Sequence, residues 1–140
     1  MRAIPGQPMG AVQLVTDGMR LVNRQGEAVR LRGINLIDKG SRVAGGWRFI
    51  PDWPEDLMDR FAQSGINLVR LGILWAAVEP SPGQYDETYF DFIGRQLDLA
   101  EQAGIAVILD MHQDLYAQRF SDGAPDWAVL TDKPYTPTPL

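Results

Sequence analysis

Two segments of the chain repeat one pattern, in which a helical stretch ends at Gly-Ile and an apolar run follows at once. The pairs are Gly65-Ile66 and Gly104-Ile105, so the repeat length is 39 residues. Glycine is common just beyond helix ends because it adopts the left-handed conformation without strain. The run at 105–109 is apolar at every position, as in a parallel sheet covered on both faces. The repeat therefore predicts an α/β fold of consecutive strand–helix units, in a closed barrel or an open sheet.

The spacing of apolar residues places the elements of these units. Steps of three and four residues predict helices over 54–64 and 87–103. Short β-prone runs predict core strands at 29–36, 66–71 and 105–110. We expect these strands to pair in parallel, with both helices on one outer face. The first strand-to-helix connection lacks the Gly-rich phosphate signature of doubly wound nucleotide-binding folds, which favours the barrel.

Turn signals outline the remaining segments. Asp17-Gly18 between short apolar runs predicts a β-hairpin, and Arg24-Gln25-Gly26 predicts a second turn. Residues 37–51 and 75–84 contain Gly or Pro without helical periodicity, so we expect both to be loops.

Composition excludes several classes of function. A net charge of −5, with Arg scattered, argues against a nucleic-acid partner, because phosphate binding gathers Lys and Arg on one face. Without Cys, the chain has no disulfide, thiolate nucleophile or Cys-ligated zinc. No apolar run reaches the roughly 18 residues of a transmembrane segment. The opening residues 1–6 lack the apolar region of a signal peptide.

The densest polar cluster, residues 110–114, lies where the last predicted strand ends. Barrel enzymes place their sites in loops at the carboxyl ends of strands. His112 and Asp114 are therefore candidates for fixing a substrate, although they could instead brace the strand end. Asp-x-His-x-Asp could also bind a divalent ion, but the chain has no second His, and we expect no metal. A Ser-His-Asp triad would have to use His112, and the chain contains no Gly-x-Ser-x-Gly elbow.

Other candidates stand outside this cluster. Arg70 lies inside an apolar predicted strand, where an unpaired guanidinium is costly to bury, so it should contact a carboxylate or the substrate. An aromatic face can stack on the C–H face of a sugar ring. Candidate platforms are Trp47, Trp53, Trp75 and Trp127.

A set of motifs between about residues 28 and 130 has the order and spacing of a known family. In sequence these are Arg70-Leu71-Gly72, Trp75, Glu79-Pro80, Pro82-Gly83, Tyr85, Gly104-Ile105 and Leu109–Asp114. Together they resemble glycoside hydrolase family five. His112-Gln113-Asp114, followed by Gly123–Ala128, looks most like the endoglycoceramidase and glycosylceramidase branch.

The resemblance implies that the chain is the N-terminal part of a (β/α)₈ TIM barrel. Residues 1–28 would be an N-terminal extension with the hairpin, and 29–140 about three βα units, truncated after strand three. Family members hydrolyse β-glycosidic bonds of glycolipids or β-glucans with retention, using an acid/base Glu after strand four and a nucleophile Glu after strand seven. Neither strand is in this chain, so we expect a fragment that lacks both catalytic residues and is inactive alone.

The resemblance also suggests roles for the candidates. Arg70 would orient the nucleophile, and His112 would contact the sugar at the cleaved bond. Asp114 would bind a hydroxyl, and Lys39 and Trp127 are further candidate substrate contacts. The family implies no cofactor, a carbohydrate or glycolipid as substrate, the remainder of the barrel as partner, and a secreted or extracytoplasmic location.

Two other hypotheses stay open on the sequence. A non-catalytic carbohydrate-binding module would be a β-sandwich, and an unrelated barrel or open-sheet enzyme would carry different strand-end residues. Glu79 and Asp110 are not expected to form the carboxylate pair of a retaining glycosidase. Glu79 precedes Pro80 well beyond a strand end, so we expect it to have a structural role.

Overall fold

The computed structural model describes residues 14–44 and 46–130, which fold into two compact units. The first unit contains the residues up to Asn35, Trp53–Arg70 and Arg95–Ile108. Leu36–Asp52, Leu71–Gly94 and the residues from Leu109 onward form the second unit. Each central strand therefore begins in the first unit and has its carboxyl end in the second.

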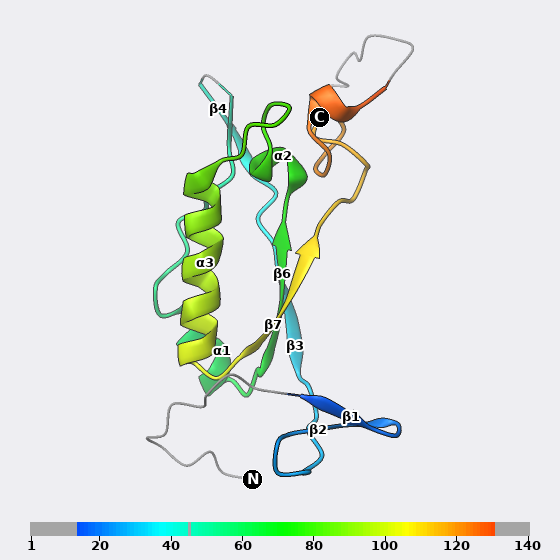
Figure 1. Cartoon of the computed structure of the whole chain (residues 1–140). Coiled ribbons are helices and arrows are strands. Elements are labelled where there is room, and N and C mark those ends of the chain that lie inside the picture. Colours follow the sequence, from blue (N-terminus) through cyan, green and yellow to red (C-terminus); the bar gives the residue numbers. More distant parts are fainter. Residues whose placement is uncertain (1–13, 45, 131–140) are drawn as a thin grey trace. The chain divides into compact units, whose positions relative to one another are not determined.

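The central sheet has the predicted topology. It is formed by β3 (Gly33–Leu36), β6 (Leu68–Ile73) and β7 (Ala106–Met111), in the order β3-β6-β7. The three strands are parallel, as Figure 1 shows. Antiparallel pairing of the second and third strands would have excluded a barrel. In β6, Val69 and Leu71 share one face and are buried.

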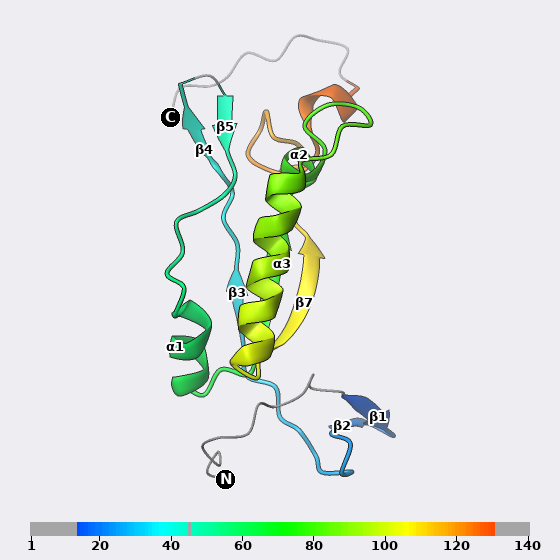
Figure 2. The same cartoon turned by 60° about the vertical axis from the view of Figure 1, so that its left-hand side comes forward.

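Both predicted helices are present, as α1 (Leu57–Gln63) and α3 (Glu87–Gln102). In the first unit, α1 and the second half of α3 lie on the same side of the strands (Figure 2). No helix in the described ranges has both the length and the apolar character needed to cross a bilayer.

The repeated Gly-Ile pairs end these helices in the same way. Gly65 and Gly104 have φ angles of 80° and 70°. After α1, Ile66 N–H donates to Phe61 O at 3.0 Å and Gly65 N–H to Ala62 O at 2.9 Å. The end of α3 repeats both bonds, from Ile105 N–H to Ala100 O and from Gly104 N–H to Glu101 O. These paired bonds form a Schellman motif, which turns the chain directly into the next strand.

The first predicted strand was too long, since β3 begins at Gly33 rather than at residue 29. The side chain of Asn67 explains the difference. Its Oδ1 accepts Arg32 N–H at 2.7 Å and its Nδ2 donates to Arg30 O at 3.0 Å. The Asn67 side chain thus bonds the backbone of Arg30 and Arg32 just before β3, while Arg32 O accepts the backbone N–H groups of Asn67 and Leu68.

The N-terminal hairpin is present, but its turn lies one residue later than predicted. The strands β1 (Val15–Asp17) and β2 (Arg20–Val22) are antiparallel, and Asp17 pairs with Arg20. Gly18 and Met19 are thus the central turn residues, and Gly18 has the positive φ, 58°, that such turns require. The second predicted turn is confirmed by the bond from Gly26 N–H to Asn23 O.

Two predicted loops contain regular structure. Residues 37–51 include a hairpin of β4 (Ser41–Val43) and β5 (Gly46–Arg48). Its strands are too short for a periodic pattern, and the cross-strand contact of Arg42 with the ring of Trp47, at 5.4 Å, supports the pairing. The segment 75–84 begins with one helical turn, α2 (Trp75–Val78), although Pro80 and Gly83 do lie in a loop. A single turn leaves too little periodicity to detect.

Close packing at Gly72 gives a stability prediction. A Cβ at this position would lie 2.4 Å from Ile37 Cγ1, whereas a Cβ on Gly94, inside α3, would meet nothing within 4 Å. We expect Gly72→Ala to lower the free energy of unfolding by about 1–3 kcal/mol through overpacking. The matched control Gly94→Ala should raise it by about 0.5–1 kcal/mol through helix propensity. Urea unfolding followed by circular dichroism measures both, and equal effects would contradict the packing at Gly72.

Candidate functional site

The candidate site lies in the second unit, where the carboxyl ends of the strands lead into loops. His112 follows β7, and its backbone N–H donates to Ile73 O, at the end of β6, at 2.8 Å. This bond extends the strand pairing beyond β7 and fixes the start of the loop. Lys39 follows β3, and Asp114 lies two residues after His112.

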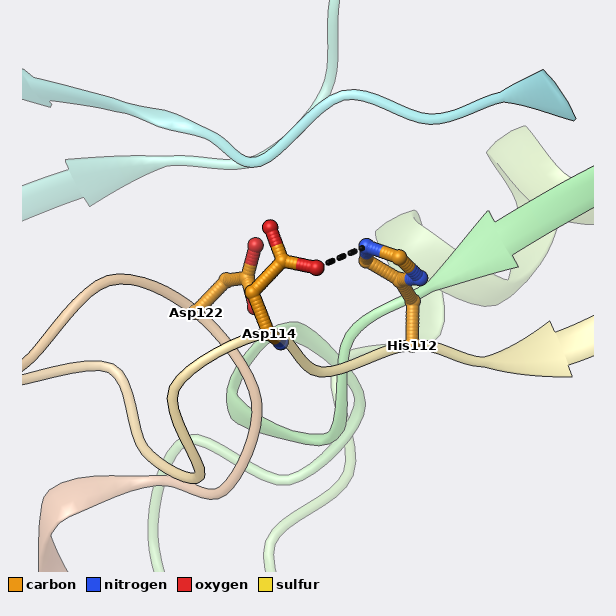
Figure 3. Close-up of side chains that lie close together, drawn as sticks. All are labelled: His112, Asp114 and Asp122. Carbon is orange, nitrogen blue, oxygen red and sulfur yellow. Dashed lines mark hydrogen bonds and ion pairs between the residues drawn. The ribbon is translucent and has the colours of Figure 1, made fainter.

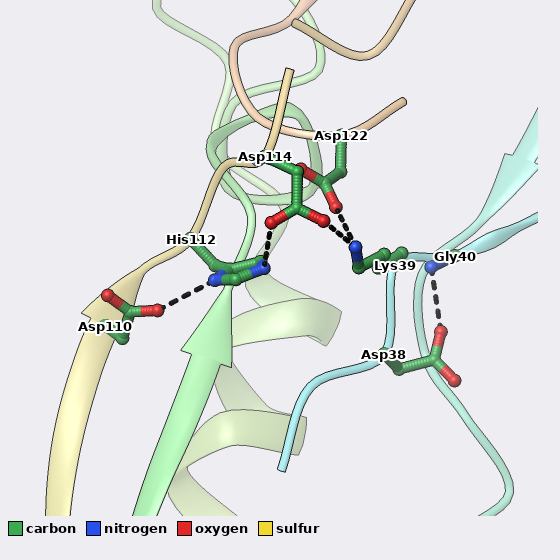
Figure 4. A network of polar contacts seen from close by, with 7 residues as sticks. All are labelled: Asp38, Lys39, Gly40, Asp110, His112, Asp114 and Asp122. Atoms are coloured by element: carbon green, nitrogen blue, oxygen red, sulfur yellow. Dashed lines mark hydrogen bonds and ion pairs between the residues drawn. The ribbon is translucent and has the colours of Figure 1, made fainter. Parts of the chain in front are cut away.

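Five side chains form one polar network in this unit, drawn in Figure 4 with Asp38 and Gly40 beside it. The ammonium of Lys39 contacts the carboxylate of Asp114 and lies 3.3 Å from Asp122 Oδ2. His112 lies between two carboxylates, with Nε2 3.4 Å from Asp114 Oδ1 and Nδ1 3.0 Å from Asp110 Oδ2. The network brings together Lys39, His112 and Asp114, three of the candidate substrate contacts, and their roles in binding stay predictions.

The members of this network differ in how far their side chains are exposed to solvent. The side chains of Lys39 and Asp114 are 47% and 44% exposed. His112 is mostly buried, and Asp122 is completely buried. Exposed charged ends can exchange their contacts with a ligand, whereas a buried carboxylate can only act through its neighbours. The arrangement offers an ammonium, a carboxylate and an imidazole, which can donate to and accept from the hydroxyl groups of one ligand.

His112, Asp114 and Asp122 also have the composition of a cation site (Figure 3). One potential ligand atom from each lies within 4.8 Å of the others. However, the ammonium of Lys39 contacts both carboxylates, so a positive charge already balances them. A metal ion would have to compete with this lysine, which favours an interpretation as an ion-pair network.

Trp127 is placed with Trp75 around Glu79. The two indole rings pack edge to face, with centroids 5.7 Å apart. Trp75 Nε1 donates to Glu79 Oε2 at 2.9 Å, and Trp127 Nε1 donates to Glu79 O at 3.0 Å. Both indole N–H groups are thereby satisfied, and both side chains stay more than a third exposed. A ligand could therefore contact only the exposed parts of the two rings and not their N–H groups.

The other sequence candidates are placed elsewhere. Arg70 is the third residue of β6 and belongs to the first unit, so its role at the site stays a prediction. Trp47 stacks on Phe49, with ring centroids 5.9 Å apart. Trp53 lies in the first unit, between β5 and α1.

Asp122 is the site residue that the sequence analysis missed. It directly precedes Gly123–Ala128, which the sequence analysis used only as a family motif. Its partners lie 8 and 83 residues away in sequence, at Asp114 and Lys39. The sequence offered one indication, an acidic residue directly before a motif of the resembled family. Such a position does not reveal which residues the carboxylate contacts.

Glu79 provides a test of pH dependence. Hydrogen bonds from the Trp75 indole and from the backbone N–H of Gly83 hold its pKa below the ordinary value of 4.5. A lowered pKa means that its stabilising effect is present above pH 4.5 and is lost as the pH falls through the folded-state pKa. We expect the indole N–H resonance of Trp75 to titrate with a midpoint below 4.5. Glu79→Gln should abolish the transition, and a midpoint at or above 4.5 would contradict the bonding.

The same pKa argues against Glu79 as an acid catalyst. A general acid needs a pKa near the working pH. For a Glu this means a raised pKa, which burial or a neighbouring carboxylate can cause. Glu79 is instead a carboxylate that orders the loop around Trp75 and Gly83. This agrees with the structural role expected from the sequence.

Comparison with known proteins identifies the family. The model described as Cellulase (glycosyl hydrolase family 5) matches residues 22–137. Endoglycoceramidase I of Rhodococcus hoagii is 34% identical over 126 residues, which cover 89% of this chain but 25% of that protein. The chain thus spans about a quarter of the length of this relative.

Solved structures agree with this match. The crystal structure of an endogalactoceramidase has a TM-score of 0.71 at 29% identity, over 85% of this chain and 30% of that one. Endo-glycoceramidase II from Rhodococcus sp., in its ganglioside GM3 complex, has a TM-score of 0.65 at 33% identity, over 84% of this chain and 29% of the other. These neighbours are TIM-barrel enzymes, so the parallel sheet described above is part of a (β/α)₈ barrel. Because the family model covers most of the chain and the fold agrees with it, this chain belongs to glycosyl hydrolase family 5.

Proposed function

We propose that the chain is the N-terminal part of a retaining β-glycosidase that acts on glycolipids and carries part of the sugar-binding site. The observation that carries this proposal is the cluster of Lys39, His112 and Asp114 at the carboxyl ends of parallel strands. This is the end of a barrel at which enzymes of this fold bind substrates. The exposed charges of Lys39 and Asp114 suit hydroxyl groups better than an apolar ligand.

The relatives favour glycolipids over β-glucans as substrates. Two are named for ceramide-linked sugars, and one solved structure is a complex with ganglioside GM3. A carbohydrate-binding module fits less well, because the structure has a parallel sheet with helices instead of a β-sandwich. A secreted or extracytoplasmic location is part of the same proposal and rests on the family resemblance alone.

Within this site we assign His112 to the sugar at the cleaved bond and Asp114 and Lys39 to its hydroxyl groups. Asp110 Oδ2 accepts a hydrogen bond from His112 Nδ1, which fixes the orientation of the ring and leaves Nε2 toward Asp114. Trp127 is proposed as an apolar platform and Arg70 as the residue that orients the nucleophile. The acid/base and nucleophile Glu residues would be supplied by the remainder of the barrel.

The proposal is tested on the protein extended to the length of its relatives, here called the extended protein. We expect it to hydrolyse an aryl β-glucoside and to release β-glucose first, seen by proton NMR before mutarotation. The corresponding aryl α-glucoside is the control and should not be hydrolysed. Release of α-glucose, or no turnover of any β-glycoside including a ganglioside, would contradict the proposal.

A further inference from the structure

Asp122 is a buried carboxylate whose two oxygens face the two most exposed members of the site. Oδ1 accepts the backbone N–H of Asp114 at 2.6 Å. Oδ2 lies 3.3 Å from Lys39 Nζ and accepts no hydrogen bond from the described residues. The side chain is fully buried, so solvent does not replace either contact. A buried charge of this kind is tolerated when another charge balances it, and here the balancing charge is Lys39.

The backbone around Asp122 is held in place independently of its carboxylate. Gly123 O accepts Ala76 N–H, from α2, at 3.0 Å. Ala124 N–H donates to Tyr116 O at 3.0 Å, and Ala124 O accepts Gln118 N–H at 2.8 Å. Gly123 has a φ of 120°, and a Cβ there would lie 2.7 Å from Tyr116 O. The carboxylate is thus presented from a rigid turn.

Lys39 and Asp114, by contrast, have few constraints of their own. Each side chain is almost half exposed, and a lysine has four rotatable methylene groups that can carry its ammonium into solvent. If Lys39 contacted Asp114 alone, the ion pair would join two exposed side chains and neither would fix the position of the other. The fixed charge of Asp122 defines where the ammonium lies, and its bond to Asp114 N–H defines where that residue begins its turn.

We propose that Asp122 is a positioning residue, which holds Lys39 and Asp114 in the arrangement that binds the sugar. This inference rests on the proposed function of those two residues. Asp122 touches no substrate in this scheme, and its charge acts through Lys39. Loss of that charge should therefore weaken sugar binding only while Lys39 is present.

A double-substitution cycle tests this dependence. The extended protein is prepared with Asp122→Asn, Lys39→Met and both together. Asn keeps an acceptor for Asp114 N–H but loses the charge that holds Lys39. We expect Asp122→Asn to raise KM for the aryl β-glucoside roughly tenfold with a smaller change in kcat. In the Lys39→Met background it should have almost no further effect on KM.

Two comparisons separate positioning from a general loss of folding. Asp126→Asn, in the same loop but with a side chain 57% exposed and paired with Arg119, is the matched control and should leave KM unchanged. Asp122→Ala loses the bond to Asp114 as well, so it should have a larger effect than Asp122→Asn. Kinetics are measured well below the melting temperature of every variant, which excludes unfolding as the cause.

Thermal stability provides a readout that does not depend on sugar chemistry. Asp122→Asn should lower Tm in the unsubstituted protein, where it breaks an ion pair. In the Lys39→Met background it should raise Tm, because it neutralises a buried carboxylate that has lost its partner.

Each outcome of the cycle decides one part of the inference. Additive effects on KM, or an unchanged KM with only a lower Tm, would overturn the positioning role. No turnover by the unsubstituted protein would refute the proposed function and the sugar-binding role with it. If Asp122→Asn still lowered Tm in the unsubstituted protein and raised it in the Lys39→Met background, the ion pair between Asp122 and Lys39 would be supported even without turnover. Failure of the proposed function and failure of the positioning role are therefore distinguishable.

Discussion

The 140-residue chain on its own should hydrolyse no β-glycoside, whereas the extended protein should do so. The resemblance to family five assigns the acid/base and nucleophile to Glu residues after strands four and seven, and the central sheet of the described chain has three strands. The carboxylates of the site are committed to Lys39 and His112, and Glu79 is held by Trp75. General acid–base assistance alone contributes about 10²–10⁴-fold, and the covalent intermediate is lost as well.

This prediction is checked by assaying both proteins with the same aryl β-glucoside at equal molar concentration. A mock purification from the expression host is the control for contaminating hydrolases. Mixing the 140-residue chain with the separately produced remainder should restore part of the turnover if the two associate. Turnover by the pure short chain would show that the catalytic groups lie within it.

His112→Ala in the extended protein should have the second-largest effect, a fall in kcat of about 10²–10³-fold, as for removal of one preorganised hydrogen-bond donor. The ring is mostly buried and fixed by Asp110, so in the proposed role it would bind the sugar without losing conformational freedom. A contact that strengthens in the transition state lowers kcat more than it raises KM when it is removed. Steady-state kinetics separate the two constants.

Two further variants make this result specific. His112→Gln retains a polar group near the position of Nε2 and should recover part of the loss. Gln102→Ala removes an exposed polar side chain at the end of α3, in the first unit, and should leave both constants unchanged. An effect of His112→Ala confined to KM would place His112 in ground-state binding and contradict the role at the cleaved bond.

The sequence by itself determined the features that depend on neighbouring residues. Gly65 and Gly104 end their helices through bonds that span five residues, so the Gly-Ile repeat was sufficient to predict two strand–helix units. Apolar spacing located α1 and α3 for the same reason. Strand-end placement of the 110–114 cluster followed from the apolar run before it. Even the errors at the Asp17-Gly18 turn and at α2 were local, a shift of one residue and one unrecognised turn.

Only the tertiary structure determined which distant groups meet. The side chain of Asn67 bonds Arg30 O and Arg32 N–H just before β3 begins, and no residue near position 29 predicts this contact. Lys39 reaches Asp114 and Asp122 across 75 and 83 residues because the three strands are parallel and their carboxyl ends share one edge. Ion pairs between distant residues produce no repeating pattern in a sequence, because they depend on where the strands end in the folded chain. Residue type and position therefore predicted the candidate site residues that follow a strand. Only the packing of the folded chain decided that Asp122 is buried and contacts them.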